Sequence, residues 1–220
     1  ARAVLFSDTH ERRLAEAEEA LAAEFGADRV RQQVCDVTDE AQVAALLDAA
    51  DRLGGVDVMV NNAGLGGTAS VLEMTDELWS RVLDITLTGT FRCVRAAGQR
   101  MVAAGRRGVI VNNASVVGWR AQEGQAHYAA AKAGGMALTR CAAMDLAPHG
   151  IRVNAVSPSL AMHPFLAKVT SDELLAELKQ REAFGRAAEP WEVANVMVFL
   201  ASDYASFLPG GGFPTSAKPA

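Results

Sequence analysis

Five short apolar runs, separated by longer amphipathic stretches, constrain the fold of this chain more than any other feature. Each run has the length of a buried strand and ends in polar residues. The stretches between them carry apolar residues three and four positions apart, as the buried face of a helix does. The runs cover residues 3–7, 29–35, 56–60, 108–114 and 151–156. This alternation predicts a three-layer α/β fold with a doubly wound parallel sheet, in one domain over residues 1–220.

The composition excludes several classes of function. The net charge is −5, and the Lys and Arg residues form no cluster that would bind nucleic acid. The apolar runs are too short to span a membrane, and the first residues do not resemble a signal peptide. Cys35, Cys93 and Cys141 lack metal-ligand spacing and are typical of buried thiols in a reducing cytoplasm. We therefore expect a cytoplasmic protein with no metal site, no nucleic-acid partner and no membrane partner.

The segment 115–132 carries the residues with the clearest chemistry. Tyr128 and Lys132 are four positions apart in an Ala-rich run, so both side chains lie on one face of a predicted helix. An ammonium close to a phenol favours the phenolate, which predicts a lowered pKa for Tyr128. A shift from about 10 to about 7 requires roughly 4 kcal/mol of differential stabilisation. Such a phenol would serve as a general acid and base near neutral pH.

Ser115 follows the 108–114 run. The carboxyl end of a parallel strand faces the crevice in which open α/β sheets bind ligands, so its hydroxyl is placed to donate to a substrate oxygen. A structural interpretation stays open for both features. Tyr-x-x-x-Lys occurs by chance, and a serine at a strand end is often a turn residue.

Several motifs in this order resemble those of the short-chain dehydrogenase/reductase family. They are Asp57-Val58-Met59-Val60-Asn61-Asn62-Ala63-Gly64, Ser115 thirteen residues before Tyr128, Asn154-Ala155-Val156-Ser157-Pro158 and residues 199–203. The resemblance covers almost the whole chain. It implies a Rossmann-like fold and oxidoreduction of a secondary alcohol or ketone with a nicotinamide cofactor. Ser115, Tyr128 and Lys132 would be the catalytic residues.

The cofactor contacts follow from the fold class and from the resemblance. In dinucleotide-binding folds, an acidic residue at the end of the second strand accepts from the adenosine ribose and disfavours a 2′-phosphate. Asp8 fits that position, and Thr9 and His10 follow it rather than Arg or Lys, so NAD is favoured over NADP. For both Asp8 and Asp36, a helix-start turn is the structural alternative. The full set expected to bind cofactor is Asp8, Asp36, Val37, Asn62, Ala63, Gly64, Tyr128, Lys132, Pro158 and Leu160.

The glycine-rich loop that cradles the pyrophosphate is not found in this sequence. It should lie about 20 residues before the acidic position, and Gly26 is the only glycine before Gly54. We therefore expect the first strand and the glycine loop to be absent from this chain, and residues to precede Ala1 in the natural protein. That strand lies at the centre of a sheet of order 3-2-1-4-5-6, so its absence would split the sheet.

Three residues depart from the family pattern. Thr86 stands where the family usually carries Asn, and we expect it to bond back to its own helix rather than to act in catalysis. Ser159 and His163 stand where relatives have Gly and Thr. These departures favour a second hypothesis, a non-catalytic family remnant that serves as a binding or assembly subunit. An epimerase or dehydratase of the extended branch would need a larger C-terminal region than the one that follows Lys132.

The resemblance also makes expectations about substrate and partners. Residues 160–186 would form a substrate lid, and the bulky Trp119 and Phe165 favour a bulky apolar substrate: a 3-oxoacyl thioester, a steroid or another cyclic ketone. Gln122, Gln125 and Met162 would complete the pocket. The helices around 76–104 and 125–146 would form the contact of a homo-dimer. A tetramer contact needs a last strand, which the tail 211–216 with its Pro214 does not predict.

Overall fold

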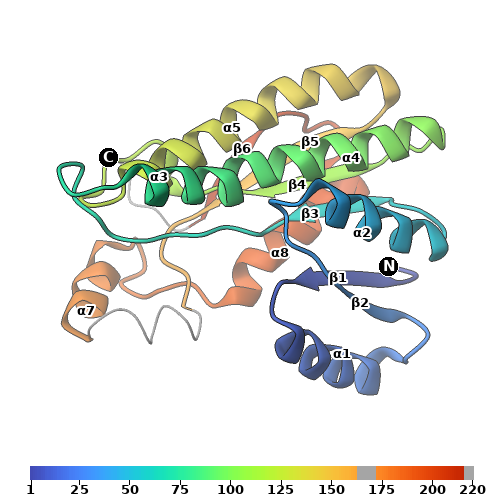
Figure 1. The fold of residues 1–220 in the computed structure, drawn as a ribbon, viewed down its shortest axis with the longest axis horizontal. Coiled ribbons are helices and arrows are strands. Elements are labelled where there is room, and N and C mark those ends of the chain that lie inside the picture. The colour runs from blue at the N-terminus through green and yellow to red at the C-terminus, as the bar shows by residue number, and fades with distance from the viewer. Residues whose placement is uncertain (163–171, 216–220) are drawn as a thin grey trace.

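The computed structural model describes residues 1–162 and 172–215 of the chain (Figure 1). The strands are β1 Val4–Asp8, β2 Val30–Val34, β3 Val58–Asn61, β4 Val109–Asn113, β5 Arg152–Pro158 and β6 Gly212–Thr215. The helices are α1 Glu11–Phe25, α2 Glu40–Arg52, α3 Asp76–Leu83, α4 Gly89–Ala103, α5 Ala126–Leu146, α7 Asp172–Arg181 and α8 Pro190–Ala201. A π-helical turn, Asp84–Thr88, joins α3 to α4.

The helix ends follow from local chemistry that the sequence displays. Asp39 begins α2 by accepting from the amide of Ala41, and Thr75 begins α3 by accepting from the amide of Leu78. Gly26 ends α1 with a positive φ of 94°, and its amide donates to the carbonyl of Ala22. A carboxylate or hydroxyl at a helix start satisfies amides that have no partner within the helix.

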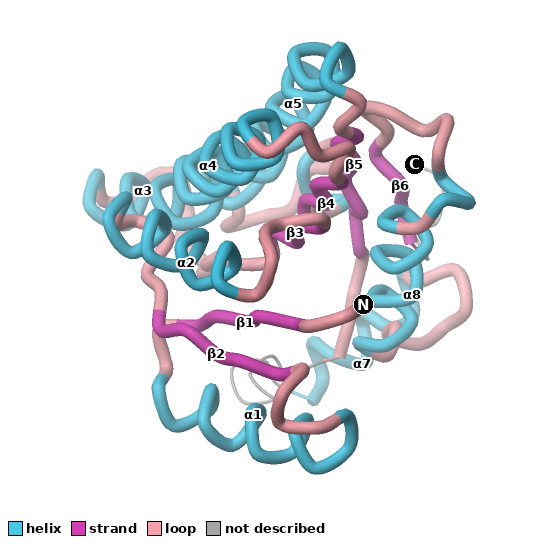
Figure 2. The backbone as a smooth tube through the Cα atoms, turned by 90° about the vertical axis from the view of Figure 1, so that its right-hand side faces the viewer, coloured by secondary structure: helices cyan, strands magenta, loops and turns pink. Residues whose placement is uncertain are grey.

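The parallel sheet consists of two parts, β2-β1 and β3-β4-β5-β6. Figure 2 shows the helices α2 to α5 over one side of β3 to β6, α8 on the other side, and α1 beyond β1 and β2. The doubly wound α/β fold is therefore confirmed, and so is the expected split. Within residues 1–162 and 172–215, no strand pairs with β1 or β3 on its second edge. Val4, Val58 and Val60 on these edges are 44–49% exposed.

The main core lies between the four-stranded part and the helices α2, α4 and α5. Ile110 and Val153 of neighbouring strands are fully buried, as are Leu47 of α2 and Met101 of α4. Burying such side chains is the main favourable term in folding, about 1.5–3 kcal/mol for each. A smaller cluster around Val111 and Leu200 fixes α8 to the opposite face.

The last strand corrects an expectation. The tail of the chain does form a strand, because Gly212–Thr215 pairs in parallel with residues 155–158 of β5. Pro214 is compatible with this strand because β6 lies at the edge of the sheet, where a missing N–H can face away from the ladder. The prediction that Pro214 excludes a last strand was therefore wrong, because proline is excluded from central strands and β6 is an edge strand.

Two features are not found in the described part of the chain. None of its helices has the length and apolar character needed to cross a bilayer. Across 1–162 and 172–215, no three His, Cys, Asp or Glu side chains come together in a way that would hold a metal ion.

Candidate active site

Buried amide side chains fix the strands on which the site is built. Asn61 of β3 donates to the side-chain carbonyl of Asn112 in β4 at 2.8 Å, and Asn112 donates to Thr139 Oγ1 of α5 at 2.9 Å. All three residues are buried. Since an unpaired buried amide costs about 1–3 kcal/mol, these bonds favour one register of β3 on β4 and one position of α5.

Ser115 lies two residues after β4, where it begins a single 3₁₀ turn, Val116–Gly118. Its Oγ accepts from the amide of Val117 at 3.3 Å, so its own proton remains for another acceptor. Gly118 lets this turn approach α5 closely. A Cβ at position 118 would lie 3.1 Å from the backbone of Lys132 and 2.7 Å from Met136. The glycine therefore holds the serine against the helix that carries the other two predicted residues.

Tyr128 and Lys132 lie next to each other on α5, as their spacing predicts. Lys132 Nζ is 5.4 Å from the centroid of the Tyr128 ring and donates to the carbonyl of Asn113 at 2.6 Å. The hydroxyl of Ser115 hydrogen-bonds the phenol. The fold thus brings together Ser115, Tyr128 and Lys132 from a strand end and a helix.

The direction of the pKa shift at Tyr128 corrects the prediction from the sequence. Burial raises the pKa of Tyr128, and only the hydrogen bond from Ser115 opposes this shift. Burial also lowers the pKa of Lys132 to about 8. The predicted lowering of the tyrosine pKa by the ammonium is therefore wrong for this site, because burial disfavours the phenolate and Lys132 is not among the groups that lower the pKa of Tyr128.

Thr86 has a different role from the one expected. Its Oγ1 accepts from the amide of Leu65 at 3.0 Å and lies 3.2 Å from the Leu65 carbonyl, so it contacts the loop after β3. Thr90 is the residue that bonds back to its helix, at the carbonyl of Thr86. Gly64 is close to both Thr86 and Lys132, because a Cβ at Gly64 would lie 3.7 Å from Thr86 Oγ1 and 3.6 Å from Lys132 Nζ. Thr86 therefore fixes this loop beside Lys132.

The predicted adenosine-side residues lie at the ends of β1 and β2. The exposed carboxylate of Asp8 accepts from the amide of His10 at 2.9 Å, while His10 itself begins α1. Asp36 accepts from the amide and hydroxyl of Thr38 at 2.9 and 2.8 Å, which is the helix-start turn considered as its alternative. Val37 packs against the helix that follows the π turn, since a Cβ at Gly89 would meet it at 2.5 Å.

The predicted nicotinamide-side residues follow β3 and β5. Asn62, Ala63 and Gly64 are exposed, and Asn62 Oδ1 accepts from Asn113 at 2.7 Å. Pro158 ends β5. Leu160 uses both of its backbone groups within the protein, because its amide donates to Glu182 at 3.4 Å and its carbonyl accepts from Ala188 at 2.8 Å. These bonds weigh against Leu160 as a contact of the cofactor carboxamide.

The backbone of the next residue, Ala161, faces the opposite side from that of Leu160. Ala161 forms a parallel bridge with Ala188, whose amide bonds the carbonyl of Leu160 and whose carbonyl accepts from Met162 at 2.9 Å. Successive residues of an extended chain point their backbone groups to opposite sides. The amide and carbonyl of Ala161 therefore point away from Ala188.

The predicted pocket residues have mixed positions. Gln125 donates to the carbonyl of Gly67 at 2.7 Å and so ties the loop after β3 to the start of α5. Trp119 is half exposed and lies over the start of β6, near Gly212. Gln122 is exposed and Met162 is partly buried. His163, Phe165 and the other residues of 163–171 lie outside the described part of the chain.

Two residues at this site were missed from the sequence. Asn113 accepts from Lys132 through its backbone, and the pairs Asn61-Asn62 and Asn112-Asn113 at the ends of neighbouring strands were a signal for this contact. Glu182 is buried beside the end of β5, and no local pattern marks it. Its contact Leu160 is 22 residues away in the chain.

Known proteins match this chain over most of its length. The family model described as "Enoyl-(Acyl carrier protein) reductase" covers residues 2–214. The (5R,7aS)-5-hydroxy-7a-methyl-1-oxo-2,3,5,6,7,7a-hexahydro-1H-indene-carboxyl-CoA reductase of Mycobacterium tuberculosis is 60% identical over 208 residues, which are 94% of this chain and 79% of the relative. The cis-4-hydroxycyclohexanecarboxylate dehydrogenase of Sinomonas cyclohexanicum is 47% identical over 177 residues, 80% of this chain and 70% of the relative.

A solved structure extends the match to three dimensions. The crystal structure of a short chain dehydrogenase from Mycobacterium smegmatis is 50% identical, has a TM-score of 0.86 and matches over 99% of this chain and 82% of its own. One family thus accounts for the motifs and for the order of strands and helices. The chain belongs to the short-chain dehydrogenase/reductase family, and the resemblance seen in its sequence is confirmed.

Proposed function

We propose that this chain is an oxidoreductase that transfers a hydride between NAD(H) and a secondary alcohol or ketone. The observation that carries the proposal is the arrangement at the end of β4. There the Ser115 hydroxyl bonds the Tyr128 phenol, and the Lys132 ammonium lies over the same ring. A hydroxyl, a phenol and an ammonium at the carboxyl end of a parallel strand are suited to moving a proton to or from a carbonyl oxygen.

The raised pKa of Tyr128 sets the protonation state of the phenol in the resting site. Because burial raises the pKa of Tyr128, the phenol holds its proton at neutral pH and can donate it to a carbonyl oxygen. Ser115 would hydrogen-bond the same oxygen. Lys132 would then stabilise the phenolate that remains after proton transfer. When bound, the nicotinamide supplies the hydride; the protein orients it and handles the proton.

The residues present fit the nicotinamide half of NAD. Lys132 lies close to Gly64 in the exposed segment Asn62-Ala63-Gly64, which suits a ribose contact. We propose that the cofactor carboxamide binds the backbone of Ala161 rather than that of Leu160, because the amide and carbonyl of Ala161 point away from Ala188. Pro158 would lie against the ring, Asp36 and Val37 against the adenine, and Asp8 against the adenosine ribose. An exposed carboxylate at that position disfavours the 2′-phosphate of NADP.

The substrate that we propose is a ring ketone or ring alcohol bearing a carboxyl or thioester group. Both relatives described above act, by their names, on hydroxylated rings that carry such a group. Trp119, half exposed over the start of β6, offers an apolar surface to a ring. Steroids and 3-oxoacyl thioesters remain the competing classes. Residues 160–186 as a lid, a homo-dimer through α3, α4 and α5, and a cytoplasmic location also stay predictions.

The proposed function is tested by removing the phenol oxygen of Tyr128. Tyr128→Phe should lower the rate of NADH-dependent ketone reduction at least about a thousandfold, because the proton donor is lost. Its circular dichroism spectrum and melting temperature should match the wild type within a few degrees. Tyr204→Phe is the matched control, since Tyr204 is 90% exposed on the last 3₁₀ turn. Turnover by Tyr128→Phe equal to the wild type would exclude the proposed role.

A binding measurement separates this function from the alternative of a non-catalytic remnant. NADH fluorescence should show saturable binding to the wild type, and NADPH should bind more weakly because of Asp8. A remnant would show no saturable signal with either dinucleotide.

A further inference from the structure

A buried carboxylate outside the catalytic residues joins three segments at the end of β5. Glu182 directly follows α7 and is only 4% exposed. Its Oε2 lies 2.5 Å from Ser159 Oγ, and its Oε1 accepts from the amide of Leu160 at 3.4 Å. Ser159 Oγ also lies 2.9 Å from the carbonyl of Thr215 in β6. We call Glu182, Ser159, Leu160 and Thr215 the Glu182 cluster.

The backbone around Glu182 is fixed independently of its side chain. The amide of Glu182 donates to the carbonyl of Lys179, and the carbonyl of Glu182 accepts from Gly185. Farther along, Arg186 forms a bidentate ion pair with Glu192 in the first turn of α8, at 2.7 Å for both bonds. The carboxylate of Glu182 therefore reaches β5 from a segment that is already attached to α8.

The residues on either side of Ala161 have their backbone groups bonded within the protein. The carbonyl of Leu160 and the amide of Met162 bond to Ala188, and the amide of Leu160 bonds to Glu182. With these groups occupied, the chain at Ala161 can point its own amide and carbonyl only to the other side. Glu182 thus supplies the acceptor for the Leu160 amide. Its other carboxylate oxygen contacts Ser159, which stands where the family pattern has glycine.

We propose that Glu182 is a positioning residue that, through Ser159 and Leu160, holds the backbone of Ala161 in the orientation that binds the nicotinamide carboxamide. The inference rests on the proposed function for its ligand. A buried carboxylate must have hydrogen-bond partners, and here its partners are the two residues that precede Ala161. Glu182 touches neither the substrate nor the cofactor. Its effect is to lower the cost of ordering this loop when the dinucleotide binds.

The test compares variants of the intact chain by two measurements. Hydrogen exchange should show a loss of protection of roughly tenfold or more across residues 159–162 and 182–188 in Glu182→Ala, because the cluster loses its central acceptor. Glu182→Gln keeps a side chain that can bond Ser159 and should lose less. Glu177→Ala, in an exposed ion pair on α7, is the control and should leave both segments unchanged.

The second measurement is NADH affinity. The dissociation constant of NADH should rise roughly tenfold in Glu182→Ala, while the rate at saturating NADH falls less than about threefold. Ser159→Ala should raise it too, and the double variant should show less than the product of the two effects, because both changes break one network.

The outcomes separate this inference from the proposed function. Unchanged exchange protection in Glu182→Ala would overturn the role of the cluster, whether or not NADH binds. If the wild type binds NADH and Glu182→Ala binds it equally well, the positioning role is wrong and the proposed function stands. If the wild type does not bind NADH at all, both fall together.

Discussion

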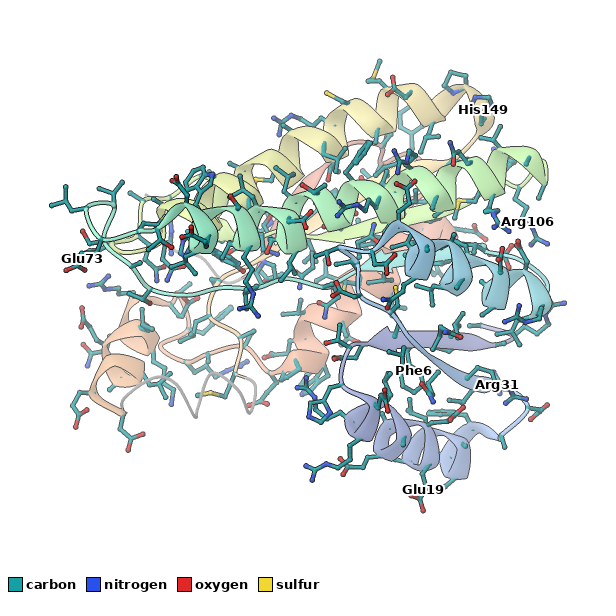
Figure 3. The ribbon with its side chains drawn as sticks, in the orientation of Figure 1. Phe6, Glu19, Arg31, Glu73, Arg106 and His149 are labelled. Atoms are coloured by element: carbon teal, nitrogen blue, oxygen red, sulfur yellow. The ribbon has the colours of Figure 1, made fainter. Side chains whose placement is uncertain are left out.

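The two parts of the sheet differ in how they are covered. In β3 to β6, helices pack on both faces, and the central strands β4 and β5 are buried almost throughout. In β1 and β2, most side chains are partly or fully exposed. Among the described residues, these two strands pair only with each other, through five residue pairs. We call β1 and β2, with α1, the thin region. Figure 3 shows Phe6 of β1 on the side of α1, and Arg31 beside the start of β2.

This difference shows where the chemistry can be located. A proton-transfer site needs side chains held within a few tenths of an ångström, and only the packed region provides that. Ser115 lies two residues after β4, and Tyr128 and Lys132 lie on α5, which packs against β5 and the turn that follows Ser115. The predicted adenosine contacts Asp8 and Asp36 lie on the thin region, where binding rather than bond making would occur.

Amide exchange is the measurement that separates the two regions most strongly. Amides of Ile110 and Val153 should exchange only by global unfolding, because both residues are fully buried in the central ladder. Amides of β1 should exchange through local opening, at least about a hundredfold faster. Equal protection in β1 and β4 would mean that the two regions unfold as one unit, and the comparison would fail.

Core truncation should show the same contrast in the free energy of unfolding. Ile110→Ala leaves a cavity at the centre of the main core and should destabilise by about 2–5 kcal/mol. Val4→Ala removes a half-exposed side chain from an edge and should cost less than about 1 kcal/mol. Urea denaturation measures both, with Met144→Ala on the exposed surface of α5 as a reference for a neutral change. A large loss in Val4→Ala would show that β1 belongs to the cooperative core.

Much of the fold could be predicted because it depends on local pattern. The apolar runs locate β1 to β5, and residues such as Asp39 and Gly26 fix where helices start and end. The last strand could not be found, because β6 depends on pairing with β5 at the edge of the sheet and carries a proline. Pairing with a distant segment leaves no periodicity in the strand itself.

The proximity of Ser115, Tyr128 and Lys132 was predicted, but their electrostatics were not. Spacing alone placed Tyr128 and Lys132 on one face of α5, and the strand pattern placed Ser115 beside them. Burial was the unknown, and it reversed the predicted shift at Tyr128. Glu182 and Thr86 could not be predicted because each bonds to a loop that is distant in the sequence.

A smaller effect than that of Ile110→Ala should come from the buried ammonium of Lys132. Burial lowers the pKa of Lys132 to about 8 from its usual 10.5. Below about pH 8 the folded protein holds a charged, buried ammonium, which destabilises it by up to about 3 kcal/mol at 1.36 kcal/mol for each pKa unit. As the pH rises from about 8 towards 10.5, the folded protein releases this proton before the unfolded chain does. The contribution of Lys132 to stability therefore increases with pH in that window.

Lys132→Met removes this pH dependence. We expect the variant to be more stable than the wild type by about 1–3 kcal/mol at pH 7, with the difference falling towards zero near pH 10.5. The gain is reduced because the carbonyl of Asn113 loses its partner. Urea denaturation at several pH values measures the difference, and Lys179→Met on α7 should show no such trend. A constant difference across pH 7–10 would mean that Lys132 is not held as a buried charge.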